Sequence, residues 1–310
     1  MKALNNRILI VVIGIICISA VNSSAQSVRE TTRAELPAFS AIRAGGDFKM
    51  EIRYGKQYSA RMGVEELFAE YVQFNVVDST LTVSMDERRV PMEVKRLFRG
   101  KDAATPAFRL TVTMPETLRS LQLDERAELV QADDLVVDPS GIELRVTDNA
   151  RVSAFQLDTR RVSLNMDKRA GAALTVRCDS LYAQVAGNAS LKVEHRSRVS
   201  EAEVAGAANL VVSGETQRLL LSAKGNSKSI LNGSAPMVRY KLSGAANVNA
   251  VNLEAEVARA EQSGLTNLTQ AAARDLYVDL STGSTLVFLN DPAIHVLSVK
   301  NATILPYDRK

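Results

Sequence analysis

Short stretches of alternating apolar and polar residues recur at a fixed period between about Leu123 and Phe288. Glycines mark the period at nearly equal spacing: Gly187, Gly206, Gly225, Gly244, Gly264 and Gly283. Strict alternation is typical of half-buried β-strands, and a period of this length is typical of a solenoid. Each period holds two strands flanking a turn of Gly, Ala and Asn, and is too short for a βαβ unit. The pattern predicts an all-β parallel β-helix with about 19–20 residues per rung.

Equivalent apolar positions recur in each period and predict inward-facing stripes. At the fourth position after the glycine lie Leu191, Leu210, Val248 and Val287. Earlier periods are irregular, and Glu125 and Asp148 replace the turn glycine there. We count about nine rungs, which at roughly 4.8 Å per rung form a rod about 40 Å long.

The chain before the repeats is less regular. We expect a flexible lead-in over 26–36 and a single β-helix domain over 37–310. Within that domain we expect irregular strands over 37–115, repeats over 116–290 and a C-terminal cap over 291–310. Alternation predicts strands at 39–42, 48–52, 72–77, 81–85 and 108–114, and a helical turn at 65–71. An excursion over 86–104 interrupts them with six basic residues: Arg88, Arg89, Lys95, Arg96, Arg99 and Lys101.

Residues 1–25 have the features of an export signal. Lys2 and Arg7 precede an apolar run over 8–20, and small residues at 23–25 predict cleavage before Gln26. No later stretch is long and apolar enough to span a membrane as a helix. Cys178 is then the only cysteine of the mature chain, and it fits an apolar core position.

Composition and charge argue against a general nucleic-acid-binding function. The 310 residues include no Trp, only 5% aromatics, and a formal net charge of +3. Removing the two basic residues of the leader leaves 36 basic against 35 acidic residues. A balanced charge gives no general attraction to nucleic acid.

The repeats carry one acidic row. Asp124, Asp148 and Asp167 fall at comparable turn positions in three successive rungs. Stacked carboxylates would suit glycoside hydrolysis or Ca²⁺ binding. Alternatively, Asp favours turns, and the row is neutralised by neighbouring bases, namely Arg126, Arg151, Lys168 and Arg169. We favour the second interpretation, because aromatic sugar platforms are scarce.

Other candidate chemistry is sparse. His195 and His295 lie far apart in the sequence with no second ligand at metal spacing, so we expect no metal site and no cofactor. The repeats also contain recurring asparagines: Asn188, Asn209, Asn226, Asn247 and Asn267. Turn formation explains them, with an Asn-lined ligand groove as the alternative. The basic excursion is either a solvated loop or a dock for an acidic polysaccharide or partner.

Several segments occur in a characteristic order. They are Phe39-Ser-Ala-Ile42, Gly46-Asp-Phe-Lys-Met-Glu-Ile52, Leu81-Thr-Val83, Leu110-Thr-Val-Thr-Met-Pro115 and Leu118-Arg-Ser-Leu121, followed by Gly-x-Ala-x-Leu-x-Val rungs. From about Pro37 onward, the chain resembles the putative auto-transporter adhesin family with the head GIN domain. It departs from that pattern at the 86–104 excursion and at Glu125 and Asp148.

The resemblance implies a right-handed β-helix in the envelope of an outer-membrane bacterium, in the periplasm or at the surface. It supplies no catalytic residues. We therefore expect an exported, non-enzymatic, adhesin-like module whose partner is an unidentified envelope protein or glycan. The alternative is a carbohydrate-active β-helix enzyme that uses the acidic row.

Overall fold

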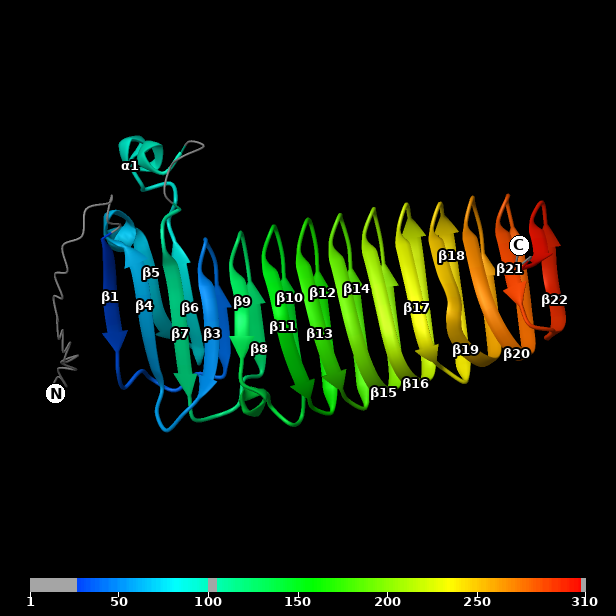
Figure 1. The fold of residues 1–310 in the computed structure, drawn as a ribbon, viewed down its shortest axis with the longest axis horizontal. Helices are drawn as coiled ribbons and strands as arrows, with labels where there is room; N and C mark the ends of the chain where they lie inside the picture. Colours follow the sequence, from blue (N-terminus) through cyan, green and yellow to red (C-terminus); the bar gives the residue numbers. More distant parts are fainter. Residues whose placement is uncertain (1–26, 100–104, 308–310) are drawn as a thin grey trace, which may run out of the picture.

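The computed structural model describes residues 27–99 and 105–307, and the predicted export signal lies outside them. The described chain is a long stack of strands, a β-solenoid, with 23 strands, two short 3-10 helices and one short α-helix. Figure 1 shows the strands side by side along the rod, in nearly sequential order from the N-terminal to the C-terminal end. The predicted all-β solenoid is confirmed.

Each rung contributes one strand to each of two parallel ladders. The first ladder includes β2 (Ala41–Ala44), β8 (Ser120–Leu123), β10 (Ile142–Val146), β12 (Arg161–Met166), β14 (Ser180–Val185), β18 (Met237–Gly244) and β22 (Ala293–Lys300). The second includes β3 (Lys49–Tyr54), β9 (Glu128–Ala132), β11 (Arg151–Asp158), β13 (Gly171–Arg177), β17 (Lys228–Ser234), β21 (Thr285–Leu289) and β23 (Thr303–Pro306). Four longer strands bend from the second ladder into the first: β15 (Ser190–Val204), β16 (Asn209–Gly225), β19 (Asn247–Gln262) and β20 (Asn267–Ser281).

The register of both ladders reproduces the sequence period. In one, Asn209 pairs with Lys228, and in the other Gly225 pairs with Gly244, each partner lying one period further along the chain. From β2 onward, the turn between the two strands of each described rung contains at least one residue with positive φ. In order along the rod these residues are Gly46, Glu125, Asp148, Lys168, Gly187, Gly206, Gly225, Gly244, Gly264, Thr282 beside Gly283, and Asn301. The replacement of glycine by Glu125 and Asp148 is confirmed, and Lys168 is a further replacement that the pattern did not reveal.

The core between the ladders is aliphatic, as the stripes predicted. Leu191, Leu210 and Val248 are buried. Val287 was wrongly assigned to the same stripe: it is partly exposed, and Leu286 pairs with Leu268 and is buried instead. The turns at Gly264 and Gly283 have the same length, since Gln262 pairs with Leu280 and Asn267 with Thr285. Thr282 therefore occupies the position of Gly264, and Gly283 lies one residue later, so counting from the glycine shifts the assignment by one.

Antiparallel strands close the N-terminal end. Strands β5 (Val72–Val77) and β6 (Thr80–Met85) form a hairpin, and β4 (Ser59–Glu65) pairs antiparallel with β7 (Phe108–Met114). The 3-10 helix η1 (Glu66–Tyr71) occupies the predicted helical turn. The lead-in expected to be flexible contains β1 (Val28–Arg33), which pairs antiparallel with β4. Its polar sequence suits this edge because only one neighbour covers it.

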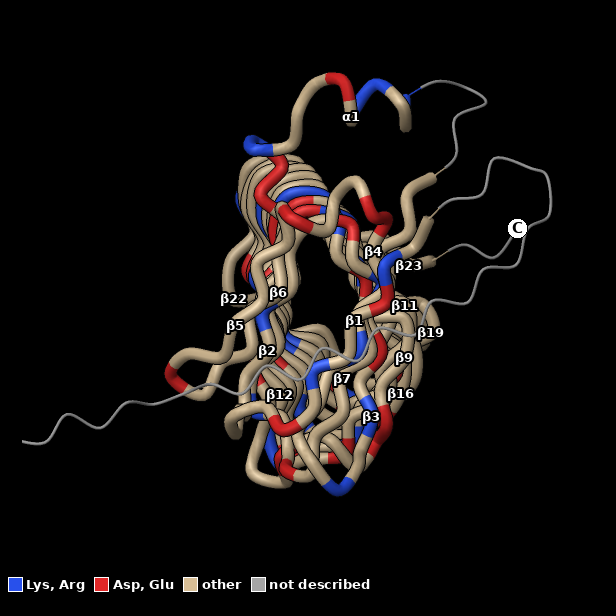
Figure 2. The backbone as a smooth tube through the Cα atoms, turned by 90° about the vertical axis from the view of Figure 1, so that its left-hand side faces the viewer, with Lys and Arg blue, Asp and Glu red and all other residues tan. Residues whose placement is uncertain are grey.

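The basic excursion replaces one turn of the solenoid. Strands β6 and β7 pair with β2 and β3, which the short Gly45–Gly46 turn connects. The equivalent connection from β6 to β7 includes the helix α1 (Met92–Leu97). Figure 1 shows α1 projecting from the rod, and Figure 2 shows it standing apart from the stacked walls and carrying basic residues.

The C-terminal segment continues the stack. We expected 291–310 to cap the rod, yet β22 and β23 pair in parallel with β20 and β21 and form a further rung. Many of their side chains stay exposed, including Val296 and Leu305. A second 3-10 helix, η2 (Asp134–Val136), follows β9.

Candidate functional site

The acidic row occupies two neighbouring columns of the turns. Asp148 has the positive φ of the glycine position, whereas Asp124 and Asp167 each precede that position in their own turns. Backbone hydrogen bonds fix the offset: Thr147 N–H donates to the Leu123 carbonyl, and Asp167 N–H donates to the Val146 carbonyl. Thr147, not Asp148, therefore stands between Asp124 and Asp167 in the column. The three aspartates are not equivalent.

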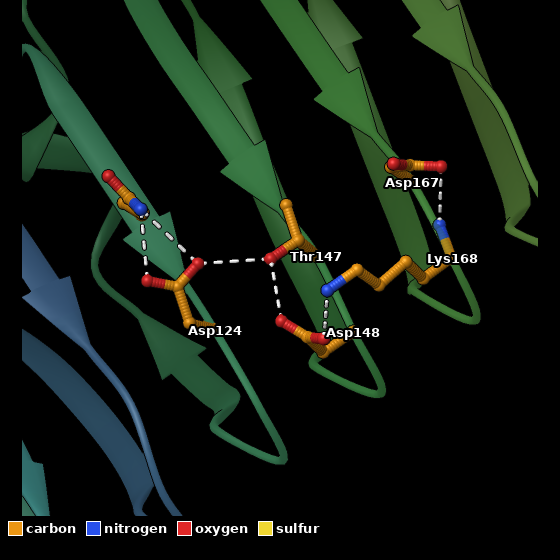
Figure 3. A network of polar contacts seen from close by, with 6 residues as sticks. Asp124, Thr147, Asp148, Asp167 and Lys168 are labelled. Carbon is orange, nitrogen blue, oxygen red and sulfur yellow. Dashed lines mark hydrogen bonds and ion pairs between the residues drawn. The ribbon is translucent and has the colours of Figure 1, made fainter.

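A chain of polar contacts joins these turns (Figure 3). The Thr147 hydroxyl lies 3.0 Å from an Asp124 carboxylate oxygen and 3.1 Å from one of Asp148. Lys168 Nζ contacts Asp148 Oδ1 at 2.5 Å, and the Lys168 backbone N–H donates to Asp167 Oδ1 at 2.7 Å. Each carboxylate thus accepts hydrogen bonds within the row.

The electrostatics of the row favour structural stabilisation. The hydrogen bond and charge of Lys168 lower the pKa of Asp148 and keep it ionised. A general acid in glycoside hydrolysis needs the opposite, a carboxyl with a raised pKa. Arg43 Nε lies 3.1 Å from Asp124 Oδ2, so this carboxylate also has a basic neighbour. Within residues 27–99 and 105–307, no group of three or more His, Cys, Asp or Glu is arranged to hold a metal ion.

Beside the row lies a cavity of about 360 Å³. It is lined by Arg43, Gly45, Gln73, Thr82, Ser84, Met85, Asp86, Asp124 and Glu125. Partial burial raises the pKa of Glu125. The sequence pattern identified Glu125 only as a replaced glycine. Glu125 lies near Gly45 because their two rungs stack on each other. In the sequence, the β5–β6 hairpin and the excursion separate these rungs.

An arginine ties three successive turns together. Arg126 donates to Asp47 Oδ2 at 2.8 Å and to Glu87 Oε1 at 2.6 Å. Asp47 belongs to the β2–β3 turn and Glu87 to the excursion. Among the bases expected to neutralise the acidic row, Lys168 pairs with it, whereas Arg126 pairs with these two acids. Neither Asp47 nor Glu87 was identified from the sequence as a partner of Arg126, because 79 and 39 residues separate them from it.

Family comparison supports the sequence resemblance. The model of the family described as "Putative auto-transporter adhesin, head GIN domain" matches residues 38–197 and 182–292. The chain belongs to this adhesin family. No curated protein matches it significantly.

Solved structures of similar proteins include three from the genus Parabacteroides. A putative lipid binding protein from Parabacteroides distasonis is 12% identical with a TM-score of 0.49, covering 91% of this chain and 96% of its own. A putative adhesin from Parabacteroides merdae is 13% identical with a TM-score of 0.48, at the same two coverages. A putative adhesin from Parabacteroides distasonis is 12% identical with a TM-score of 0.41, covering 91% and 97%.

The two histidines of this adhesin-family chain lie far apart in the rod. His195 is buried in a corner of β15, where its Nδ1 lies 3.1 Å from the Ser197 hydroxyl and 3.2 Å from the Ser200 hydroxyl. Burial lowers the pKa of His195 to about 4. His295 stacks on Tyr277 at the C-terminal end and contacts Asp275 at 2.8 Å. Among the described residues, neither imidazole belongs to a group of three or more His, Cys, Asp or Glu side chains that could hold a metal ion.

The recurring asparagines divide into two groups. Asn188 and Asn226 lie in the turns, as expected. Asn209, Asn247 and Asn267 were expected to form turns but begin β16, β19 and β20, and their side chains are exposed. The three lie in one register row on the outer face of the second ladder, with Lys228 in the rung between the first two.

Proposed function

We propose that this chain is an exported, non-enzymatic module of the cell envelope, located in the periplasm or at the surface, that contacts a protein or glycan. Membership of the adhesin family supports a binding role. In the described ranges 27–99 and 105–307, no helix has the length and apolar character needed to cross a membrane.

The surface best suited to such contact is the outer face of the second ladder. The row containing Asn247 repeats small polar groups at the strand spacing of about 4.8 Å. The next row contains Val211, Ile230 and Asn249, in register on successive rungs, and Ile230 is 45% exposed. Hydrogen-bonding groups beside exposed apolar side chains are the composition of protein-contact and glycan-contact surfaces. This regular face carries the proposal.

A binding screen tests it. A glycan array combined with a pull-down from envelope extract identifies the ligand. The double variant Asn209→Arg, Asn247→Arg then introduces bulk and charge on the face and is expected to weaken binding about tenfold or more. The matched control Asn165→Arg, Gln184→Arg makes the same kind of change on the first ladder and should bind normally. Equal loss in both variants, or turnover of an envelope glycan by the purified protein, contradicts the proposal.

The alternative function is carbohydrate cleavage near the acidic row. The cavity that contains Asp124 and Glu125 favours it, because such enzymes use two carboxyls, one of which has a raised pKa, as Glu125 has. The ion pair at Asp148 opposes it. If Asp124→Asn, Asp148→Asn and Asp167→Asn leave sugar cleavage and calcium binding unchanged, the acidic row has no role in either.

A further inference from the structure

A second cavity lies where the excursion meets the first rungs of the rod. Its volume is about 370 Å³, within the usual range for small-molecule sites. It is lined by Asp47, Phe68, Met85, Glu87, Val90, Met92, Lys95, Phe98, Arg99, Pro106, Phe108 and Arg126. The helix α1 forms one wall, and the closed end of the solenoid forms the other.

The inner part of the cavity is apolar and aromatic. Phe68 and Phe108 are almost fully buried, with ring centroids 5.4 Å apart. Phe98 of the excursion lies 5.2 Å from Phe68 by the same measure. Three of the eight phenylalanines of the chain thus meet here, whereas the solenoid core is mainly aliphatic. Apolar walls of this kind favour a hydrocarbon chain or ring.

The rim of the cavity has an excess of positive charge. Its two acids, Asp47 and Glu87, are both held by Arg126. Lys95 and Arg99 form no ion pair with any described residue, and Arg99 is exposed. Two bases that have no ion-pair partner among the described residues therefore lie beside an apolar cavity, and an anionic group would supply the complementary charge.

We propose that this cavity binds an amphiphile with an apolar chain and an anionic head group. The chain packs against Phe68, Phe98 and Phe108, and the head group lies between Lys95 and Arg99. The excursion, which replaces a short turn in this rung alone, supplies both bases and one of the aromatic rings. The proposal is independent of the adhesin-like contact, which uses the outer face of the second ladder.

Titration calorimetry of the full mature chain with decanoate, below its micelle concentration, tests the proposal. We expect saturable binding of decanoate, weaker binding of octanoate by about tenfold because two methylenes are lost, and no binding of decylammonium. The variant Lys95→Glu, Arg99→Glu should weaken decanoate binding about tenfold or more. Arg96→Glu is the matched control: Arg96 lies on the same helix outside the cavity, and its variant should bind decanoate normally.

Thermal unfolding confirms that the variants remain folded, since all three positions lie on the projecting excursion. Equal binding of decanoate and decylammonium would show an apolar cavity without charge selection and would overturn the proposal. Absence of decanoate binding, or equal weakening by Arg96→Glu, would overturn it as well. The variant Asn209→Arg, Asn247→Arg tests the contact with a glycan or protein and should not change decanoate binding. Failure of one proposal can therefore be distinguished from failure of the other.

Discussion

Gly206 lies directly above Gly187, so close that a Cβ atom on Gly206 would stand 2.8 Å from the Gly187 carbonyl oxygen. Its φ of +75° is also one that side chains rarely adopt. The same stacking recurs between Gly225 and Gly206. Glycine at this position therefore serves two needs, a left-handed turn and a close approach between rungs.

Gly206→Ala should destabilise the protein by about 2–3 kcal/mol, since the methyl group meets backbone and the left-handed conformation is strained. Gly171→Ala is the matched control. Gly171 has no positive φ, and a Cβ there would only touch the Arg151 side chain at 3.7 Å. Urea unfolding of both variants measures the difference. Equal stability of the two would show that the stack relaxes around an added methyl.

His195 makes stability depend on pH. Its folded-state pKa of about 4 lies below the ordinary value of 6.5, because the buried imidazole is desolvated. The unfolded chain therefore takes up the proton first, and stability is full above about pH 6.5 and falls as pH decreases toward 4. The loss is about 3 kcal/mol. In His195→Gln, the stability measured by urea unfolding should fall less steeply over that interval; an unchanged slope would assign it to other groups.

Asp138 should stabilise the corner before β10. Its buried carboxylate accepts bonds from the Ser140 hydroxyl and backbone at 2.5 and 2.7 Å, and from Arg119 at 2.8 Å. Ser140 first, and then Arg119, lower the pKa of Asp138 to about 2. Asp138→Ala should cost about 2 kcal/mol at neutral pH. The wild-type advantage should persist above pH 3.8 and disappear as pH falls through 2.

The exposed Asp158, in a weak pair 4.0 Å from Arg177, provides the comparison. Asp158→Ala should leave the thermal midpoint nearly unchanged, because exposed ion pairs contribute little. A similar drop in both variants would mean that burial of Asp138 has no special consequence.

Glu125→Gly should stabilise the chain by about 0.5–1 kcal/mol. Glu125 occupies the glycine position with φ of +59°, and partial burial disfavours its charged form, as its raised pKa shows. Glycine removes the strain and the partly desolvated charge, at a smaller cost in unfolded-state entropy. The thermal midpoint measures the gain. A lower midpoint would show that contacts of the Glu125 side chain outweigh the strain.

The period of the sequence predicted the solenoid because stacking brings residues one period apart into direct contact. The same logic located the stripe of Leu191, Leu210 and Val248. It failed where the glycine shifted within its turn, as at Val287, and for two antiparallel strands outside the repeat, β1 and β4. Neither strand belongs to a repeat that could reveal it, and the polar residues of the edge strand β1 resemble those of a loop.

The site was less predictable than the fold. The row of Asp124, Asp148 and Asp167 was recognisable as a set of turn residues, but its one-residue offset required the backbone hydrogen bonds. Contacts such as that between Arg126 and Asp47 join segments from different rungs, and no spacing in the sequence predicts these contacts. The cavity under α1 depends on how an irregular insertion folds back.

Constant register has a consequence for how such a rod changes length. Because Gly225 pairs with Gly244 and Arg218 with Met237, each position in this part of the rod has its counterpart exactly one period further on. A gene segment encoding one period is therefore an interchangeable unit here. Its duplication or loss would lengthen or shorten the molecule by one strand spacing, about 4.8 Å, while the joined ends meet equivalent neighbours. The length of the rod can therefore change by inherited steps of one period, while the surfaces at its two ends stay the same.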